Sequence, residues 1–256
     1  MELIGAAAIA FAVAAVTTPA GLSGAFLMVP VQLSVLGMAA AAVPPTNLVY
    51  NIISIPGALA KFKSDAAIDR ALSLRILAGT VPGIVVGVIL SRELLHSPTA
   101  FLLVVAAVLA PLGLWLALAT PPTPRAEGEE DGHDAAIVSV SGGSGVIGGL
   151  YGIGGGAIIA PVLVGLGIAV RKVAPATLLA TFVTSIVGVV VFELFASSGR
   201  GEGVDWGVAG ALGIGGLAGS YLGARIQPRV PEAALRRLLG VLALLLSARY
   251  VLQAAF

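Results

Sequence analysis

The sequence predicts an all-α polytopic membrane protein with two inverted-topology repeats, each a re-entrant helical hairpin plus three transmembrane helices. Three observations predict this fold. The chain is 58% hydrophobic and 11% charged, whereas a soluble domain carries about 25% charged residues. A glycine-broken apolar stretch occurs once in each half, and the positive charges fall unevenly between the loops.

The two halves match each other without a gap. Residues 21–57 pair with residues 152–188, and ten positions are identical. Glycines, prolines and hydroxyl residues in one register are hard to obtain by chance, so we infer an internal duplication. The identical pairs are Gly21 with Gly152, Gly24 with Gly155, Pro30 with Pro161, Val31 with Val162, Pro44 with Pro175, Thr46 with Thr177, Leu48 with Leu179, Ser54 with Ser185, Ile55 with Ile186 and Gly57 with Gly188.

Apolar runs define the elements. A transmembrane helix needs about 20 apolar residues. The runs 3–18 and 25–37 are too short to cross, and together they are too long for one helix, so each half is expected to begin with a re-entrant hairpin. The first repeat, residues 1–119, has a hairpin at 3–37 and helices at 45–60, 72–91 and 99–119. A hydrophilic cytoplasmic linker spans 120–136. The second repeat, residues 137–256, has a hairpin at 137–169 and helices at 174–196, 206–224 and 235–254.

The positive charges support this topology independently. It places eleven Lys and Arg residues on one face and three on the other, and an excess of positive charge marks the cytoplasmic side. This topology places both termini on the outer side of the cytoplasmic membrane. If residues 3–37 and 137–169 each crossed the membrane once, the positive charges would divide evenly between the two faces. If each formed a pair of short full spans, the charges would be distributed as they are for hairpins. The first face receives Lys61, Lys63, Arg70, Arg75, Arg125, Arg171, Lys172, Arg225, Arg229, Arg236 and Arg237, and the second receives Arg92, Arg200 and Arg249.

Small residues and acids mark further helix features. Asp69 and Asp205 precede predicted helices and are expected to be N-terminal caps or partners of the helix dipole. Glycines spaced by four let helices approach closely in lipid, and such stripes occur in both halves with a register shift of five residues. They are Gly79, Gly83 and Gly87, and Gly215, Gly219 and Gly223.

The glycine breaks are typical of an anion-binding site. The half-helices that begin near Ala25 and Gly156 present free N–H groups and the positive end of a helix dipole. Glycine also lets the backbone approach a ligand. Tight helix crossing is the alternative explanation for these glycines. The site residues expected at the two breaks are Gly21, Ser23, Gly24, Ala25, Gly154, Gly155 and Gly156.

A polar stripe follows each hairpin, with residues four apart on one helix face. Uncharged hydrogen-bond donors suit an anion that must be held and then released. The alternative is that they bond to neighbouring helices or to their own backbone. The stripe residues expected to complete the site are Thr46, Asn47 and Asn51, and Thr177, Thr181 and Ser185.

Other functional classes are not expected. No set of nucleophile, base and acid is visible, and GIGGGA at 152–157 lacks the flanking strand and the later acid of a dinucleotide fingerprint. We therefore expect no enzyme, cofactor or metal site. A net charge of +1 without a basic stripe argues against a nucleic-acid partner. Glu193 is the one candidate for a proton-coupling acid, and a helix-end surface role is its alternative.

The two breaks, GLSGAFLMVP and GIGGGAIIAP, each followed by a Pro-x-Thr segment, resemble those of the TauE/SafE sulfite exporter family. The resemblance extends over nearly the whole chain. It implies transport of sulfite or an organosulfonate such as sulfoacetate. In the first break, Ser23 and Ala25 occupy the positions that Gly154 and Gly156 occupy in the second. Because this departs from the family's usual glycine-rich form, the resemblance does not identify which anion is the substrate.

We expect a secondary transporter that works by alternating access, with one repeat rocking against the other. Its partners would be a small anion and the lipid bilayer. The coupling ion, proton or sodium, and the oligomeric state, a homodimer included, stay open. The alternatives are an uncoupled anion channel or uniporter and a non-transporting membrane assembly subunit.

Overall fold

The computed structural model describes residues 2–65, 68–94, 134–165, 168, 170–197 and 203–231, with single residues and short stretches at 103–118 and 233–252. Every regular element within these ranges is helical, which confirms the predicted all-α class. The expected linker up to residue 133 lies outside the described residues, and most of the expected helices 99–119 and 235–254 does too.

The described elements of both halves are helices. The first half contains α1 (Glu2–Thr17), η1 (Thr18–Ala20), α2 (Ala25–Pro30), the π-helical turn η2 (Val31–Val35), η3 (Ala40–Ala42), α3 (Val43–Ser64) and α4 (Arg70–Leu94). The second contains α6 (Asp134–Tyr151), α7 (Gly156–Gly165), α8 (Val170–Ala196), α9 (Trp206–Ile226) and η5 (Gln227–Arg229).

The second hairpin begins three residues earlier than expected, at Asp134 instead of residue 137. Asp134 lies in the first turn of α6, where the helix dipole favours a negative charge. Its carboxylate also pairs with Arg75 of α4, with Nε and Oδ1 3.1 Å apart. These two interactions extend the helix into what we expected to be linker.

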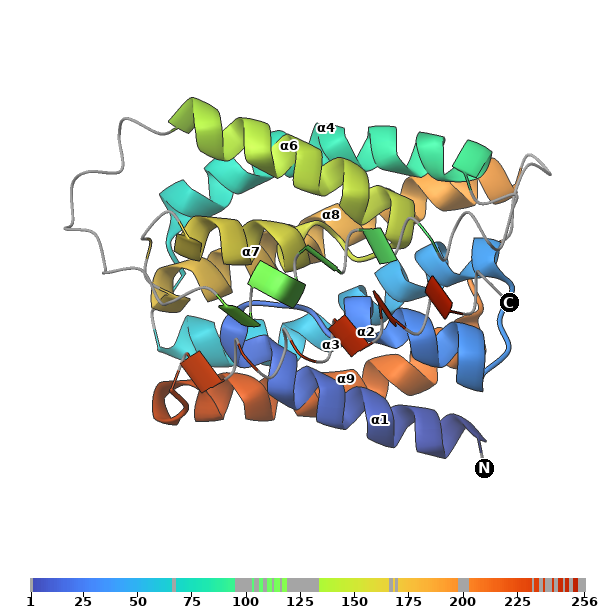
Figure 1. The fold of residues 1–256 in the computed structure, drawn as a ribbon, viewed down its shortest axis with the longest axis horizontal. Helices are drawn as coiled ribbons and strands as arrows, with labels where there is room; N and C mark the ends of the chain where they lie inside the picture. The colour runs from blue at the N-terminus through green and yellow to red at the C-terminus, as the bar shows by residue number, and fades with distance from the viewer. Residues whose placement is uncertain are drawn as a thin grey trace.

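The helices form layers that mix the two halves (Figure 1). α4 and α6 lie at one side of the molecule, α1 and α9 at the other, and α3 and α8 lie between them. α1, α3 and α9 run in one direction, whereas α4, α6 and α8 run in the opposite direction. The first helix of each hairpin therefore packs on the last described long helix of the other half.

The two glycine stripes explain this pairing. A methyl group added to Gly215, Gly219 or Gly223 would collide with the carbonyl oxygens of α1 or their neighbouring atoms, at Ala7, Phe11 and Ala15 in turn. The stripe of α4 meets α6 in the same way, at the carbonyl oxygens of Val138, Gly142 and Val146. These contacts confirm that the stripes serve close packing. The residues met on α1 and α6 differ by 131, the offset of the duplication.

The expected caps are present. Asp69 Oδ1 accepts a hydrogen bond from Leu72 N at 3.0 Å, at the start of α4. Asp205 Oδ1 accepts one from Val208 N, also at 3.0 Å, at the start of α9. Each carboxylate thus satisfies an N–H group that has no partner inside its own helix.

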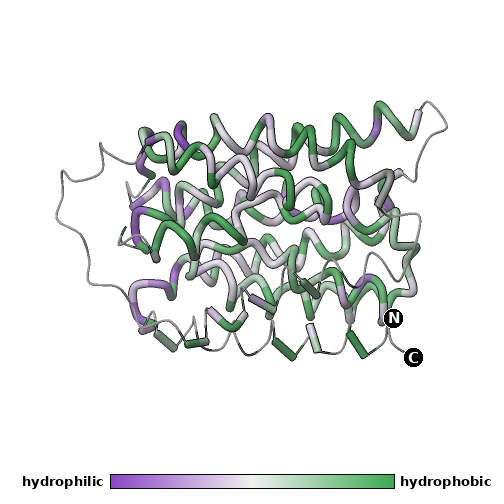
Figure 2. Tube along the Cα trace, turned by 45° about the horizontal axis from the view of Figure 1, so that its top comes forward, coloured by the Kyte–Doolittle hydropathy of each residue, from purple (hydrophilic) through white to green (hydrophobic). Residues whose placement is uncertain are grey.

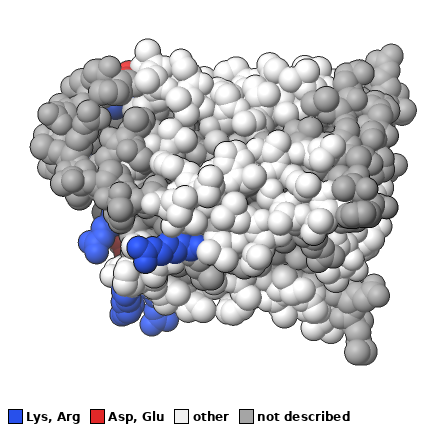
Figure 3. All heavy atoms as spheres, viewed as in Figure 1, with Lys and Arg blue, Asp and Glu red and all other residues white. Residues whose placement is uncertain are grey.

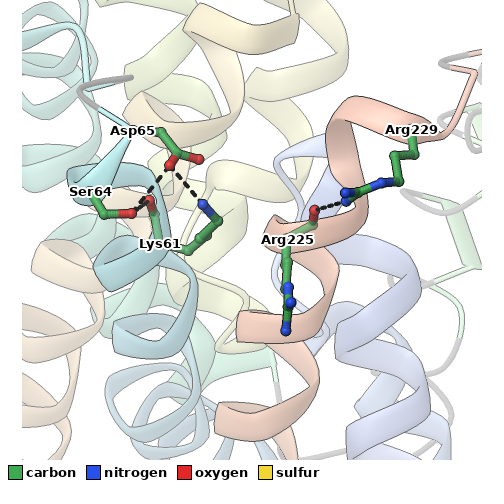
Figure 4. A network of polar contacts seen from close by, with 5 residues as sticks. All are labelled: Lys61, Ser64, Asp65, Arg225 and Arg229. Atoms are coloured by element: carbon green, nitrogen blue, oxygen red, sulfur yellow. Dashed lines mark hydrogen bonds and ion pairs between the residues drawn. The ribbon is translucent and has the colours of Figure 1, made fainter.

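The apolar positions extend through the bundle, and hydrophilic positions gather toward its ends (Figure 2). The Lys and Arg side chains in view lie at one end (Figure 3). At this end, Lys61 Nζ pairs with Asp65 Oδ1 at 2.7 Å, and Arg229 donates to the carbonyl oxygen of Arg225 at 3.2 Å (Figure 4). The hydrogen bond from Lys61 lowers the pKa of the exposed Asp65 carboxyl. α1 begins at the opposite end of the bundle.

By length and composition, four described segments could cross a membrane: Leu3–Ala20, Arg70–Ser91, Val170–Ala196 and Trp206–Arg229. The first has 18 residues because η1 extends α1. The expectation that the run 3–18 is too short to cross therefore does not hold by length alone. Whether this segment crosses the membrane or belongs to a hairpin depends on where the chain turns back after it.

Candidate functional site

Both hairpins reverse at glycines with left-handed backbone. Gly21 has φ 79° and Gly152 has φ 68°, a region that side chains other than glycine rarely adopt. After the first turn, a methyl group on Gly24 would lie 3.1 Å from Val13 Cγ1 of α1. After the second, one on Gly155 would lie 3.1 Å from the carbonyl oxygen of Ser144 of α6. In each hairpin the chain thus returns beside its own first helix.

The two hairpin tips, residues 21–24 and 152–155, are held by α8. Thr177 Oγ1 lies within hydrogen-bonding distance of the carbonyl oxygen of Gly21 at 3.0 Å and of the carbonyl oxygen of Val173 in its own helix at 2.9 Å. A methyl group on Gly156 would lie 3.1 Å from the carbonyl oxygen of Thr177. Two segments separated by more than 130 residues therefore contact the same turn of one helix.

The second tip has a further attachment to α8. Thr184 Oγ1 lies 3.1 Å from the carbonyl oxygen of Gly154 and 2.8 Å from that of Ala180 in its own helix. Thr181 Oγ1 donates to the carbonyl oxygen of Thr177 at 2.8 Å. The hydroxyl groups of α8 thus fix the tip and their own helix, as expected for threonine in a membrane helix.

α3 holds the first hairpin through an amide. Asn47 Nδ2 donates to the carbonyl oxygen of Ala25 at 3.0 Å, and Asn47 Oδ1 accepts from Gln32 Nε2 at 3.1 Å. Both groups of this buried amide are engaged with the α2–η2 segment. Thr46 lies elsewhere, because its Oγ1 accepts a hydrogen bond from Asp205 N at 3.0 Å.

Other buried polar atoms have no hydrogen-bond partner among the described residues. Asn51 is fully buried, and both its Nδ2 and its Oδ1 are without a partner. The hydroxyl groups of Ser185, Ser23 and Ser144 are also buried without a hydrogen-bond partner. A buried polar group left unpaired costs about 1–3 kcal/mol. Native proteins leave few such groups, so these atoms are suited to bind a molecule from outside the chain.

The polar residues expected at the site thus fall into two groups. All lie at the tips or on the two helices that hold them. Thr46, Asn47, Thr177 and Thr181 make hydrogen bonds within the protein, whereas Ser23, Asn51 and Ser185 keep unpaired polar atoms. Sequence reasoning missed Gln32 and Ser144. A polar residue inside an otherwise apolar run was the available signal for both.

The buried side chains that the structure describes around the site are uncharged. Among the described residues, the buried side chains with polar atoms belong to Ser, Thr, Asn, Gln and Tyr. Glu193, the candidate coupling acid, lies near the end of α8, where its Oε1 accepts from Val204 N at 3.3 Å. That contact supports its alternative role at a helix end.

Comparison with known proteins gives one result that covers the chain. The model of the sulfite exporter TauE/SafE family matches residues 6–250. The match includes both hairpins and every helix that holds them. A search of curated proteins finds no match.

Proposed function

Because the chain belongs to the TauE/SafE sulfite exporter family, we propose that it moves sulfite or an organosulfonate such as sulfoacetate across the cytoplasmic membrane by alternating access. The family is one of membrane transporters, so the chain is a transporter and not an enzyme. The family also implies a small anionic substrate and a lipid environment.

The observation that carries the proposal is the convergence of the two hairpin tips on the Thr177 turn of α8. Irregular backbone inside a bilayer is tolerated where protein or a water-filled cavity covers it, and in transporters such breaks bind substrate. Helix starts favour negative charge. Uncharged donors around them would bind an anion without holding it permanently.

The proposed substrate shell combines the two tips with the polar faces of α3 and α8. Its members come from both halves of the chain, which is the usual location for the site of a transporter built from repeats. The members proposed are Gly21, Gly24, Ala25, Asn51, Gly154, Gly155, Gly156, Thr181 and Ser185. Thr46, Asn47 and Thr177 make hydrogen bonds within the protein and position this shell.

We also propose that residues 1–119 and 137–256 form inverted repeats. Matching elements run in opposite directions, as α3 and α8 do. Gly24 returns beside Val13, and Gly155 returns beside Ser144, a pair of contacts displaced by the same 131 positions. The re-entrant reading of both hairpins is part of this proposal, with both termini outside and the Lys- and Arg-rich end in the cytoplasm.

The packing suggests which parts move. If each sequence repeat moved as a unit, the glycine contacts of α1 with α9 and of α6 with α4 would have to separate. We therefore replace the expected rocking of repeats with motion between two bodies, α1–α3–α9 and α4–α6–α8. The α3–α8 interface and the hairpin tips lie between these bodies.

Transport by the purified protein in liposomes tests the proposed function. We expect radiolabelled sulfite to enter liposomes that contain the protein faster than protein-free liposomes. Unlabelled sulfite or sulfoacetate trapped inside should accelerate this entry by exchange. If neither sulfite nor any sulfonate exchanges, the proposed function is wrong, and a non-transporting assembly role becomes the better account.

A second function, an uncoupled channel or uniporter, is favoured by one observation. The buried side chains among the described residues include no Asp, Glu, Lys or Arg that could carry a coupling proton. The same liposomes separate the two, with an imposed proton or sodium gradient. Accumulation that follows one gradient indicates coupling, whereas flux that follows only the sulfite gradient and membrane potential indicates a uniporter.

A further inference from the structure

We propose that the anion is held on one side of the centre, by the start of α7 with Asn51 and Ser185, and that it binds as a single negative charge, as hydrogen sulfite. This inference rests on the proposed function and deepens it. It departs from a symmetric site, in which the starts of α2 and α7 would contribute equally.

Whereas the second hairpin is attached at one carbonyl oxygen, that of Gly154, the first hairpin is attached at two. Its carbonyl oxygens at Gly21 and Ala25 accept hydrogen bonds from Thr177 and Asn47. Gln32 completes this attachment by donating to Asn47. In addition, α2 is only six residues long before its π-helical turn, so its dipole is small. Asn47 and Thr177 are then positioning residues, which fix the tip and do not touch the anion.

The second hairpin is distinguished by its longer helix, since an unpaired hydroxyl group lies at both tips, Ser23 at the first and Ser185 at the second. α7 has ten residues, and its first N–H groups have no acceptor within the helix. Ser185 Oγ is buried and unpaired, and a methyl group on Gly154 would lie 3.2 Å from it. The hydroxyl group therefore points at the tip that leads into α7.

Asn51 faces the same region from α3. α3 and α8 are antiparallel, and Leu48 contacts Gly188 across their interface. Asn51 lies one turn beyond Leu48, and Ser185 lies one turn before Gly188, so the two are at the same level. Ile55, the next turn of α3, packs in a buried cluster with Leu178 of α8. Asn51 is thus on the side of α3 that faces α8.

The chemistry of these groups selects the charge state. No buried side chain among the described residues is a cation. The sulfite dianion, whose two charges share one small group, would therefore lose far more hydration energy than hydrogen sulfite, because the cost of burying charge rises steeply with its magnitude. Asn51 also presents an unpaired acceptor, Oδ1, beside its donor. Hydrogen sulfite has anionic oxygens for the donors and one O–H group for Oδ1. Sulfite dianion has no proton to offer.

Calorimetric titration of the purified full-length protein with sulfite and with methanesulfonate tests both parts. Ser185→Ala and Asn51→Leu should weaken binding of hydrogen sulfite at least about tenfold. Ser23→Ala removes the unpaired hydroxyl group that a symmetric site would use, and it should leave the affinity unchanged. Thermal unfolding of each variant checks folding, and Ser185→Ala is the conservative change that keeps the test valid if Asn51→Leu does not fold.

The pH dependence tests the charge state. Above the pH at which hydrogen sulfite loses its proton, the Kd for total sulfite should rise about tenfold per pH unit, because the binding form becomes scarce. The Kd for methanesulfonate, a monoanion throughout, should stay constant. Equal losses for Ser23→Ala and Ser185→Ala, or a Kd for total sulfite that does not rise in alkali, would overturn the inference and leave the transporter role intact. If the unaltered protein binds neither compound, the proposed function itself fails.

Discussion

At the scale of single residues, the main finding is the division of polar side chains between holding the hairpins and keeping free polar atoms. Thr177 illustrates the first group. Its hydroxyl group reaches a carbonyl oxygen 156 residues earlier in the chain. The stripe of Thr177, Thr181 and Ser185 was visible in the sequence, but which members bond inside the protein depends on how the tips dock against α8, and no local pattern records that.

Thr177→Val should destabilise the protein, because the buried carbonyl oxygen of Gly21 loses its donor from α8 at a cost of about 1–3 kcal/mol. Thr80→Val is the matched control, since Thr80 is equally buried and its hydroxyl group donates to Ile76 of its own helix. Thermal unfolding in detergent compares the two. Equal melting temperatures for both variants would mean that the hydroxyl group of Thr177 does not fix the tip.

At the scale of helices, the fold was largely predictable and its pairing was not. Apolar runs bounded by charge or by glycine and proline located α3, α4, α8 and α9, and the glycine clusters located both hairpin turns. The two glycine stripes predicted close helix contacts. They did not identify the partners, because a glycine face accepts the backbone of a neighbouring helix and no local pattern records which helix that is. The crossed pairing of α1 with α9 and α6 with α4 emerges only when both hairpins are placed.

Gly219→Ala should cost about 1–3 kcal/mol of stability, since the added methyl group collides with the backbone of α1 at Phe11. Gly210→Ala, in the same helix, is the control, because no atom lies within 4 Å of the position its methyl group would take. This control should be neutral or slightly stabilising, as alanine favours helix over glycine. The melting temperatures of the two variants are compared by thermal unfolding. If Gly219→Ala is as stable as Gly210→Ala, then α1 and α9 do not pack closely at Gly219.

At the scale of the whole molecule, the two bodies α1–α3–α9 and α4–α6–α8 predict how transport can be blocked. The chain has no cysteine, so introduced pairs are the sole thiols. A disulfide between Leu48→Cys and Gly188→Cys joins the bodies and should stop sulfite exchange until it is reduced. A disulfide between Ile53→Cys and Gly213→Cys lies within one body, where a methyl group on Gly213 would be 2.7 Å from Ile53 Cβ.

The second pair should leave exchange unchanged in both redox states. Exchange is measured in liposomes before and after reduction, so that each variant serves as its own reference. Unimpaired exchange with the first disulfide fully formed would mean that the α3–α8 interface stays fixed during transport. Loss of exchange with the second would mean that α3 and α9 move apart, and the division into bodies would be wrong.

The proposed function requires that two hairpins enter the bilayer from opposite faces and meet inside it at one anion site. The most direct test is a structure of the sulfite-bound protein in a lipid nanodisc by electron cryomicroscopy. We expect both glycine turns within the hydrocarbon layer and density for the anion beside Gly154 and Ser185. Either turn at the lipid–water surface, or the anion bound away from both tips, would contradict it.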